Sequence, residues 1–138
     1  MTIQNKEQEI IDDFAIYDDW MEKYEYIIEL GKDLPQIDEK YKTEDNIIKG
    51  CQSQVWLHAD KKDDKIYYTA DADAIIAKGI ISLLIQVLSG QTADDILNAK
   101  LDFIKEIGLQ EHLSPTRSNG LVAMIKQMKM YALALKNK

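Results

Sequence analysis

The sequence is poor in cysteine and histidine, which limits the chemistry open to it. Its 138 residues contain one cysteine, Cys51, and two histidines, His58 and His112. A single cysteine excludes an intramolecular disulfide, and an unpaired thiol is typical of a reducing compartment. One thiol with two scattered histidines also lacks the ligand spacing of a zinc or iron–sulfur site. We therefore expect no metal in this chain.

Catalytic motifs and long apolar runs are missing as well. There is no Walker loop, dinucleotide-binding fingerprint or Gly-x-Ser-x-Gly elbow, so we expect no bound cofactor. The longest apolar run, Ala74–Leu88, is interrupted by Lys78, Ser82 and Gln86 and is shorter than the ~20 residues that cross a bilayer. Residues 1–13 are acidic and lack the pattern of a secretory signal. We expect a cytoplasmic protein with no membrane partner.

Basic charge is scarce. The chain has 17 Lys and Arg residues against 24 Asp and Glu residues, a net charge of −7. This balance argues against a nucleic-acid partner, because neutralising phosphates is the main source of such affinity. With 46% apolar residues, the chain is long enough to form a core without disulfides. We expect one domain spanning residues 1–138.

Apolar spacing predicts helices at both ends of the chain and strands in the middle. Two helices are expected in the first 31 residues, the second capped by Asp19 and ended by a left-handed Gly31 before Pro35. Residues 34–46 form a polar connection. Alternation over residues 54–59 and a β-prone run over 66–69 predict a hairpin with its turn at Asp60–Asp64, and Asn46–Lys49 is a candidate third strand.

The second half predicts helices whose ends are marked by capping residues. Asp73 is expected to cap a helix over Ala74–Leu88, Thr92 to open a short helix through Asn98, and Ser114 with Pro115 to begin the last helix. Another short helix is expected to end at Gly108. The order of elements predicts an α+β fold, in which a small three-stranded antiparallel sheet packs against several helices.

Cys51 lies at a turn before a strand, between Gly50 and Gln52, and not on a periodic apolar face. It is either a small buried apolar side chain or a reactive thiol. A Cys–His dyad with His58 is not expected, because a regular strand at ~3.3 Å per residue places the two residues more than about 20 Å apart. His112, between two helices, is more often structural than catalytic in such a position.

Arg117 is unusual for its place in the last helix. If Ser114 caps that helix, a cation stands in the first turn, where the helix dipole disfavours it by ~0.3–1 kcal/mol. Solvent exposure, an ion pair or a function could each account for a cation at this position. Met124 and Met128 fall on the buried stripe of the same helix, so we interpret the methionine cluster as core and not as a soft-metal site.

Four separated motifs together resemble the SufE family of cysteine desulfuration proteins. They are Tyr24–Pro35 (YEYIIELGKDLP), Asn46–Trp56 (NIIKGCQSQVW), Asp71–Gly79 (DADAIIAKG) and His112–Leu121 (HLSPTRSNGL). The resemblance extends from about Phe14 to Leu135. It implies a fold like that of the iron–sulfur scaffold IscU, without the cysteines that hold a cluster.

The resemblance also implies a role for Cys51. It corresponds to the cysteine that accepts sulfur as a persulfide from a SufS-type cysteine desulfurase, whose pyridoxal phosphate belongs to that partner, and passes it to a SufBCD-type iron–sulfur scaffold. The chain would then stimulate the desulfurase and be a sulfurtransferase-like partner rather than an enzyme in the strict sense. Roles in shaping the loop or docking the partner are implied for a further set of residues: Gly50, Gln52, Ser53, Asp73, Lys78 and Arg117.

Other functions stay open at this point. A direct cluster scaffold is disfavoured, because one thiolate cannot supply four ligands even across a dimer. A single-cysteine redox sensor would need a thiol of low pKa that reacts with peroxide. A paralogous desulfurase that feeds a different sulfur pathway is another possible donor.

Overall fold

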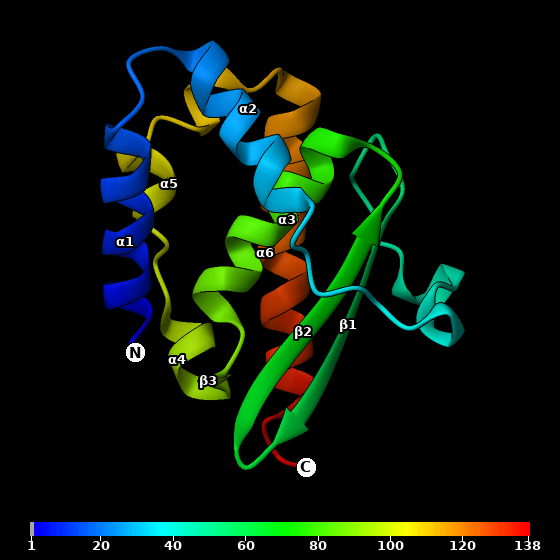
Figure 1. Cartoon of the computed structure of the whole chain (residues 1–138). Coiled ribbons are helices and arrows are strands. Elements are labelled where there is room, and N and C mark those ends of the chain that lie inside the picture. Colours follow the sequence, from blue (N-terminus) through cyan, green and yellow to red (C-terminus); the bar gives the residue numbers. More distant parts are fainter. Residues whose placement is uncertain (1) are drawn as a thin grey trace.

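The helices and strands follow the predicted order of helices, hairpin and helices (Figure 1). The structure is a computed structural model and describes residues 2–138. Its α-helices are α1 (Ile3–Ala15), α2 (Trp20–Gly31), α3 (Ile75–Leu88), α4 (Ala93–Asn98), α5 (Phe103–Glu106) and α6 (Pro115–Leu135). Its strands are β1 (Val55–Lys62), β2 (Lys65–Ala72) and β3 (Gln91–Thr92), and its short 3-10 helices are η1 (Glu39–Tyr41), η2 (Glu44–Asn46) and η3 (Gln110–His112).

Three helices begin where the sequence predicts, at residues that satisfy free N–H groups of the first turn. The side chains of Asp19, Thr92 and Ser114 each accept a hydrogen bond from the backbone N–H three residues later, at 2.9, 3.2 and 3.4 Å. Gly31 ends α2 as predicted but is not left-handed, which corrects the expected cap. Glycine is needed at position 31 for a different reason: α3 packs so close to it that a Cβ would collide with the backbone of α3.

The sheet is antiparallel in the order β1-β2-β3, which confirms the α+β class. The hairpin turn is tighter than predicted, because only Asp63 and Asp64 lie outside the ladder, both with positive φ. The third strand is not Asn46–Lys49. That segment leaves η2 and makes one isolated bridge, from Ile47 to Trp56, while β3 pairs with the other side of the hairpin.

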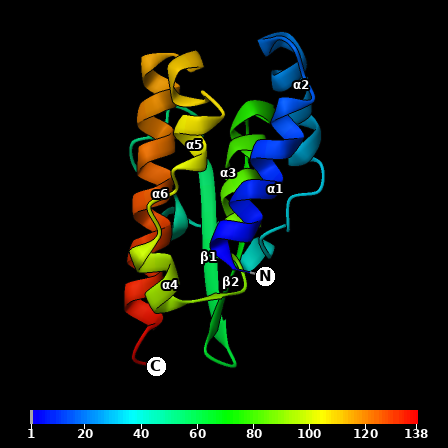
Figure 2. The ribbon, with the colours of Figure 1, turned by 90° about the vertical axis from the view of Figure 1, so that its left-hand side faces the viewer.

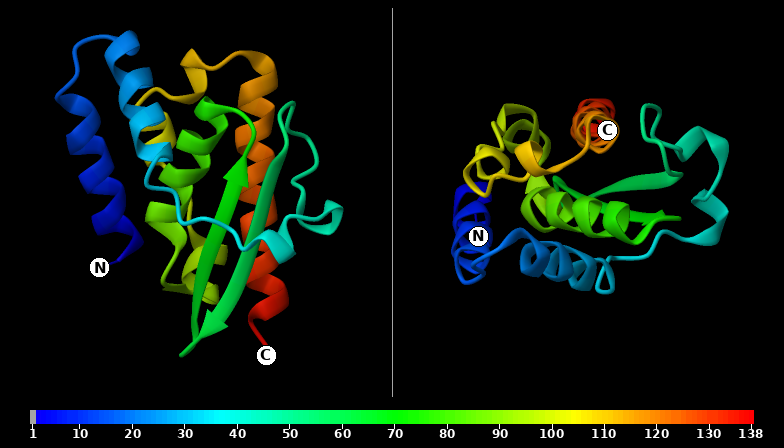
Figure 3. Two further views of the ribbon diagram at one scale, coloured as in Figure 1. Left: turned by 45° about the vertical axis from the view of Figure 1, so that its right-hand side comes forward. Right: turned by 90° about the horizontal axis from the view of Figure 1, so that it is seen from above.

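The hairpin lies between helices on its two sides. Seen edge-on in Figure 2, it has α6 on one side and α2 on the other. Helix α3 packs beside β2, α6 packs against β1, and α2 covers α3 (Figure 3). The core between these layers is fully apolar at its centre, where Ile27, Leu57, Ile66, Ile81 and Met128 are 0% exposed. This frame brings the N-terminal halves of α3 and α6 to the same end of the sheet as the segment before β1.

Candidate functional site

Cys51 lies in a short loop that the backbone closes on itself. The Ile48 N–H donates to the Val55 carbonyl oxygen at 2.8 Å, so residues 49–54 project from the start of β1. Gly50 has a φ of 98°, a conformation that residues with a Cβ rarely adopt. Glycine at this position therefore allows the turn that presents the thiol.

The loop rests on helix α6. The Cys51 Sγ lies 3.7 Å from the Gly120 carbonyl oxygen, within reach of a weak S–H hydrogen bond, and a Cβ on Gly50 would lie 3.2 Å from the Cβ of Ala123. The thiol is consequently half-buried. Small residues on this face of α6 let the loop come close.

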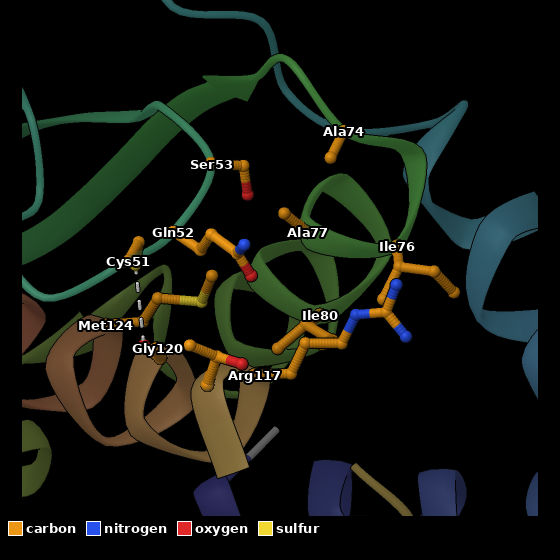
Figure 4. A pocket seen from close by; sticks show the side chains of 11 residues that line it. Cys51, Gln52, Ser53, Ala74, Ile76, Ala77, Ile80, Arg117, Gly120 and Met124 are labelled. Carbon is orange, nitrogen blue, oxygen red and sulfur yellow. Dashed lines mark hydrogen bonds between the residues drawn. The ribbon is translucent and has the colours of Figure 1, made fainter. Parts of the chain in front are cut away.

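A cavity of about 250 Å³ opens beside the thiol (Figure 4). The loop, the start of α3 and the first turns of α6 line it, with the residues Cys51, Gln52, Ser53, Ala74, Ile76, Ala77, Ile80, Thr116, Arg117, Gly120 and Met124. The walls from α3 and from Met124 are apolar. Since a water molecule occupies about 30 Å³ in the liquid, one added sulfur atom would fit beside Cys51 with room to spare.

Burial controls the protonation of the thiol. Partial burial raises the pKa of Cys51 above its ordinary value, because an apolar environment disfavours the thiolate. No histidine is among the cavity-lining residues: within the described chain, His58 stacks on Tyr41 at 3.6 Å and His112 stacks on Trp20 at 4.0 Å. The resting Cys51 is therefore a neutral thiol without a general base beside it.

Arg117 stands at the far rim of the cavity from Cys51, in the first turn of α6 as the sequence predicts. Its side chain is exposed and runs past Ile80 toward Ile76 (Figure 4). No Asp or Glu carboxylate in residues 2–138 lies within 4.0 Å of its guanidinium, which excludes an internal ion pair there. The cation is thus available to an anionic group outside the chain or at the cavity mouth.

Asp73 has a different role from the helix cap that its position predicts. The N-cap of α3 is Ala74, without a side-chain hydrogen bond. The Asp73 carboxylate instead accepts from the Gln54 N–H at 3.0 Å, and the Asp73 N–H donates to the Gln54 carbonyl oxygen at 3.1 Å. This paired contact fixes the end of the Cys51 loop that leads into β1.

Lys78 lies in an ion-pair network outside the cavity lining. Its Nζ is 3.4 Å from Asp71, which also accepts from Lys42 at 3.0 Å, and Lys42 lies over the Trp56 ring at 4.7 Å. Burial by itself would raise the pKa of Asp71, but hydrogen bonds from Lys42 and the Ala72 N–H and the charge of Lys78 together lower it. The network ties the segment before the Cys51 loop to β2 and α3.

The structure therefore brings together Cys51, Gln52, Ser53 and Arg117, places Asp73 at the base of the loop, and keeps Lys78 apart from the cavity. Sequence reasoning missed the apolar walls, Ala77, Ile80 and Gly120, because their positions depend on the crossing of α3 and α6. Their helical spacing was visible, but it is the same signal that any buried helix gives. Among residues 2–138, no three His, Cys, Asp or Glu side chains gather to hold a metal ion, and no helix has the length and hydropathy needed to span a bilayer.

Comparisons of sequence with known proteins agree on one family, and a comparison of structure shows the same fold. The SufE family model, described as an Fe-S metabolism associated domain, matches residues 8–132. The chain is 43% identical to an uncharacterized SufE-like protein of Rhizobium meliloti strain 1021 over 90% of this chain and 92% of that protein. It is 40% identical to SufE-like protein 1, chloroplastic/mitochondrial, of Arabidopsis thaliana over 96% of this chain and 36% of that protein. The solution structure of a hypothetical protein from Thermus thermophilus shares the fold, with a TM-score of 0.80 at 20% identity over 96% of this chain and 97% of that one.

Proposed function

The chain belongs to the SufE family, and from this we propose that it accepts sulfur as a persulfide on Cys51 from a cysteine desulfurase. The observation that supports this function best is the half-buried Cys51 thiol in a short loop at an apolar cavity. The cavity offers space beside the sulfur atom, and its apolar walls partly cover that space. A persulfide, which is easily reduced or oxidised, needs both.

The proposed transfer is an exchange reaction between sulfur atoms. The Cys51 thiolate attacks the outer sulfur of a persulfide on the desulfurase, and a new S–S bond forms. The S–S bond on the desulfurase breaks, and its cysteine leaves as a thiolate. One S–S bond replaces another, so no external oxidant or reductant is required, and the only proton to be moved is that of Cys51.

The finer parts of the proposal concern the partners. We assign the donor to the SufS type and the recipient to a SufBCD-type scaffold, and we expect the acceptor to stimulate its donor by removing the product sulfur. The unpaired Arg117 at the cavity rim supports docking of an anionic or persulfide-bearing partner group. The cytoplasm stays the expected compartment.

A peroxide-sensing function is disfavoured by the same geometry. A sensor cysteine reacts as an exposed thiolate of low pKa, whereas burial raises the pKa of Cys51. A cation beside the thiol would lower the pKa of Cys51, but Arg117 lies across the cavity (Figure 4).

Intact mass spectrometry tests the proposed function directly. After incubation with a cysteine desulfurase and free cysteine, the wild-type chain should gain the mass of one or more sulfur atoms, and Cys51→Ser should gain none. Serine fits the same half-buried loop, so the folded state should be little affected. Sulfur retained by the serine variant, or none gained by the wild type, would overturn the proposal.

A further inference from the structure

The segment that leads to Cys51 is attached to α6 at three points. Asn46 Oδ1 accepts from the Tyr131 hydroxyl at 3.1 Å, Gly50 lies against Ala123, and the Cys51 Sγ faces the Gly120 carbonyl. The segment therefore runs antiparallel to the helix. Its end contacts lie eleven residues apart on α6 and five residues apart on the segment.

Asn46 joins three elements through one side chain. Its Nδ2 donates to the Tyr41 carbonyl oxygen at 2.7 Å, while its Oδ1 accepts from Tyr131. Tyr41 in turn stacks on His58 of β1, with ring centroids 3.6 Å apart and ring planes 8° apart. Because both ends of the amide are engaged, its orientation is fixed. Asn46 thereby links η1, η2 and α6 immediately before the Cys51 loop.

Tyr131 is suited to be a constant donor in this link. Burial of its phenol, with the nearby charge of Asp45, raises its pKa above the ordinary value although a hydrogen bond with Gln127 acts in the opposite direction. The hydroxyl consequently keeps its proton at and well above neutral pH. The hydrogen bond to Asn46 does not switch off in the range where thiols react.

We propose that Asn46 and Tyr131 are a positioning pair that holds the Cys51 loop on α6 and so sets the burial and reactivity of the thiol. They hold the segment that enters the loop from η2, while Asp73 and Gln54 hold the end that enters β1. Ile48, which lies between Asn46 and the loop, is 2% exposed, so this part of the segment stays attached to the core when the pair is lost. Loss of the pair should therefore loosen the loop without unfolding the chain.

Only the biological role of the Asn46–Tyr131 pair, to shelter a persulfide until the partner docks, rests on the proposed function. The effect of the pair on the position of the loop is a property of the free protein. It can therefore be measured without any desulfurase, on the rate at which a small alkylating reagent modifies Cys51.

Tyr131→Phe removes only the hydroxyl, and Tyr68→Phe is its matched control. The Tyr68 hydroxyl also donates to α6, to the Met128 carbonyl oxygen at 2.7 Å, but it comes from β2 and does not reach the loop. Iodoacetamide modification of Cys51 would be followed from pH 6 to pH 10 for both variants and for Asn46→Ala, together with their thermal midpoints.

Tyr131→Phe should raise the alkylation rate at neutral pH by about fivefold, the factor that one net hydrogen bond permits, and Asn46→Ala, which also loses the bond to the Tyr41 carbonyl oxygen, should raise it at least as much. Both should also shift the midpoint of the rate toward lower pH, because a more exposed thiol ionises more easily. Tyr68→Phe should lower the thermal midpoint and leave the rate and its pH midpoint unchanged. The double variant should gain no more than Asn46→Ala alone, since that substitution already breaks the contact between the two residues.

Unchanged alkylation in Tyr131→Phe, or an equal increase in Tyr68→Phe, would overturn the positioning role. The second result would mean that any loosening of α6 exposes the thiol. Sulfur loading by a desulfurase is scored separately by mass. A wild-type chain that accepts no sulfur, with alkylation responding as expected, would overturn the proposed function and leave the positioning pair intact.

Discussion

Gly31 and Gly79 face each other where α2 crosses α3. A Cβ on Gly31 would lie 2.9 Å from the Gly79 nitrogen, and a Cβ on Gly79 would overlap the carbonyl oxygen of Ile27. Real Cβ atoms do not approach backbone this closely, so the two helices can pack at this distance only because both positions lack a side chain. The contact fixes α3, whose first turns form one wall of the cavity.

Gly79→Ala should therefore destabilise the fold. The added methyl group meets backbone, which cannot move aside as a flexible side chain would, and we expect a loss of about 2–3 kcal/mol in the free energy of unfolding. Chemical denaturation would measure it. Gly120→Ala is the matched control, because its Cβ would make an ordinary contact 3.5 Å from the Cys51 Sγ, and a helical glycine replaced by alanine gains about 0.5–1 kcal/mol. Equal stability of the two variants would contradict the close crossing.

Arg117→Ala should slow sulfur acceptance without destabilising the chain. The guanidinium is exposed, has no internal carboxylate partner in the described residues, and opposes the dipole of α6. Its removal should leave stability unchanged or raise it by up to about 1 kcal/mol. Sulfur loading by a desulfurase, followed by intact mass, should slow severalfold. Lys126→Ala, which removes an exposed cation from the same helix outside the cavity lining, should leave loading at the wild-type rate. If Arg117→Ala were less stable than the wild type but accepted sulfur at the full rate, Arg117 would have a structural role.

Capping residues were predictable from the sequence where the contact is local. Ser114 and Thr92 bond to N–H groups three residues away, and residue type and spacing suffice to find them. Asp73 shows the limit of this reasoning. Its position before α3 is typical of a cap, but its carboxylate is taken by Gln54, 19 residues earlier in the chain. A long-range partner of this kind leaves no periodic signal.

Local patterns and long-range contacts differ in the same way for the strands and for the site. The alternation after Gln54 predicts β1. The third strand, however, depends on which distant segment reaches the free edge of β2, and that segment begins at Gln91, after α3. Cys51 was identifiable from its polar, aperiodic surroundings. The contact between Asn46 and Tyr131 was not, because 85 residues separate the two in the chain.

The contribution of Asp71 to stability should depend on pH. Its pKa is lowered in the folded protein, so the folded state binds the proton less tightly than the unfolded chain. The charged carboxylate thus stabilises the fold above the ordinary pKa of about 4, and this stabilisation is lost as pH falls through the lower folded value. Asp71→Asn should have a lower thermal midpoint than the wild type at pH 7.

The difference between Asp71→Asn and the wild type should shrink steadily below pH 4. Asp60→Asn, on an exposed carboxylate of β1, is a suitable control and should show a much smaller difference at pH 7. A gap for Asp71→Asn that persisted unchanged at pH 2–3 would show that packing of the side chain, and not its charge, stabilises this part of the fold.

Docking of a desulfurase should expose Cys51. In the free protein the thiol is half-buried and its pKa is raised by that burial, so alkylation by a bulky maleimide at pH 7 should be slow. An inactive desulfurase that cannot load sulfur should accelerate the reaction if docking draws the loop off Gly120. A coupling of ~1–3 kcal/mol between docking and loop opening corresponds to about a 5–150-fold change in rate.

The comparison requires the desulfurase at a concentration shown to saturate binding, with its own cysteine replaced so that only Cys51 reacts. Asp73→Ala, which frees the Gln54 N–H at the base of the loop, should alkylate faster than the wild type in the absence of the partner and gain less when the partner is added. Equal rates for the wild type with and without the partner would mean that docking leaves the loop in place. Sulfur would then have to reach Cys51 through the cavity mouth, past Arg117.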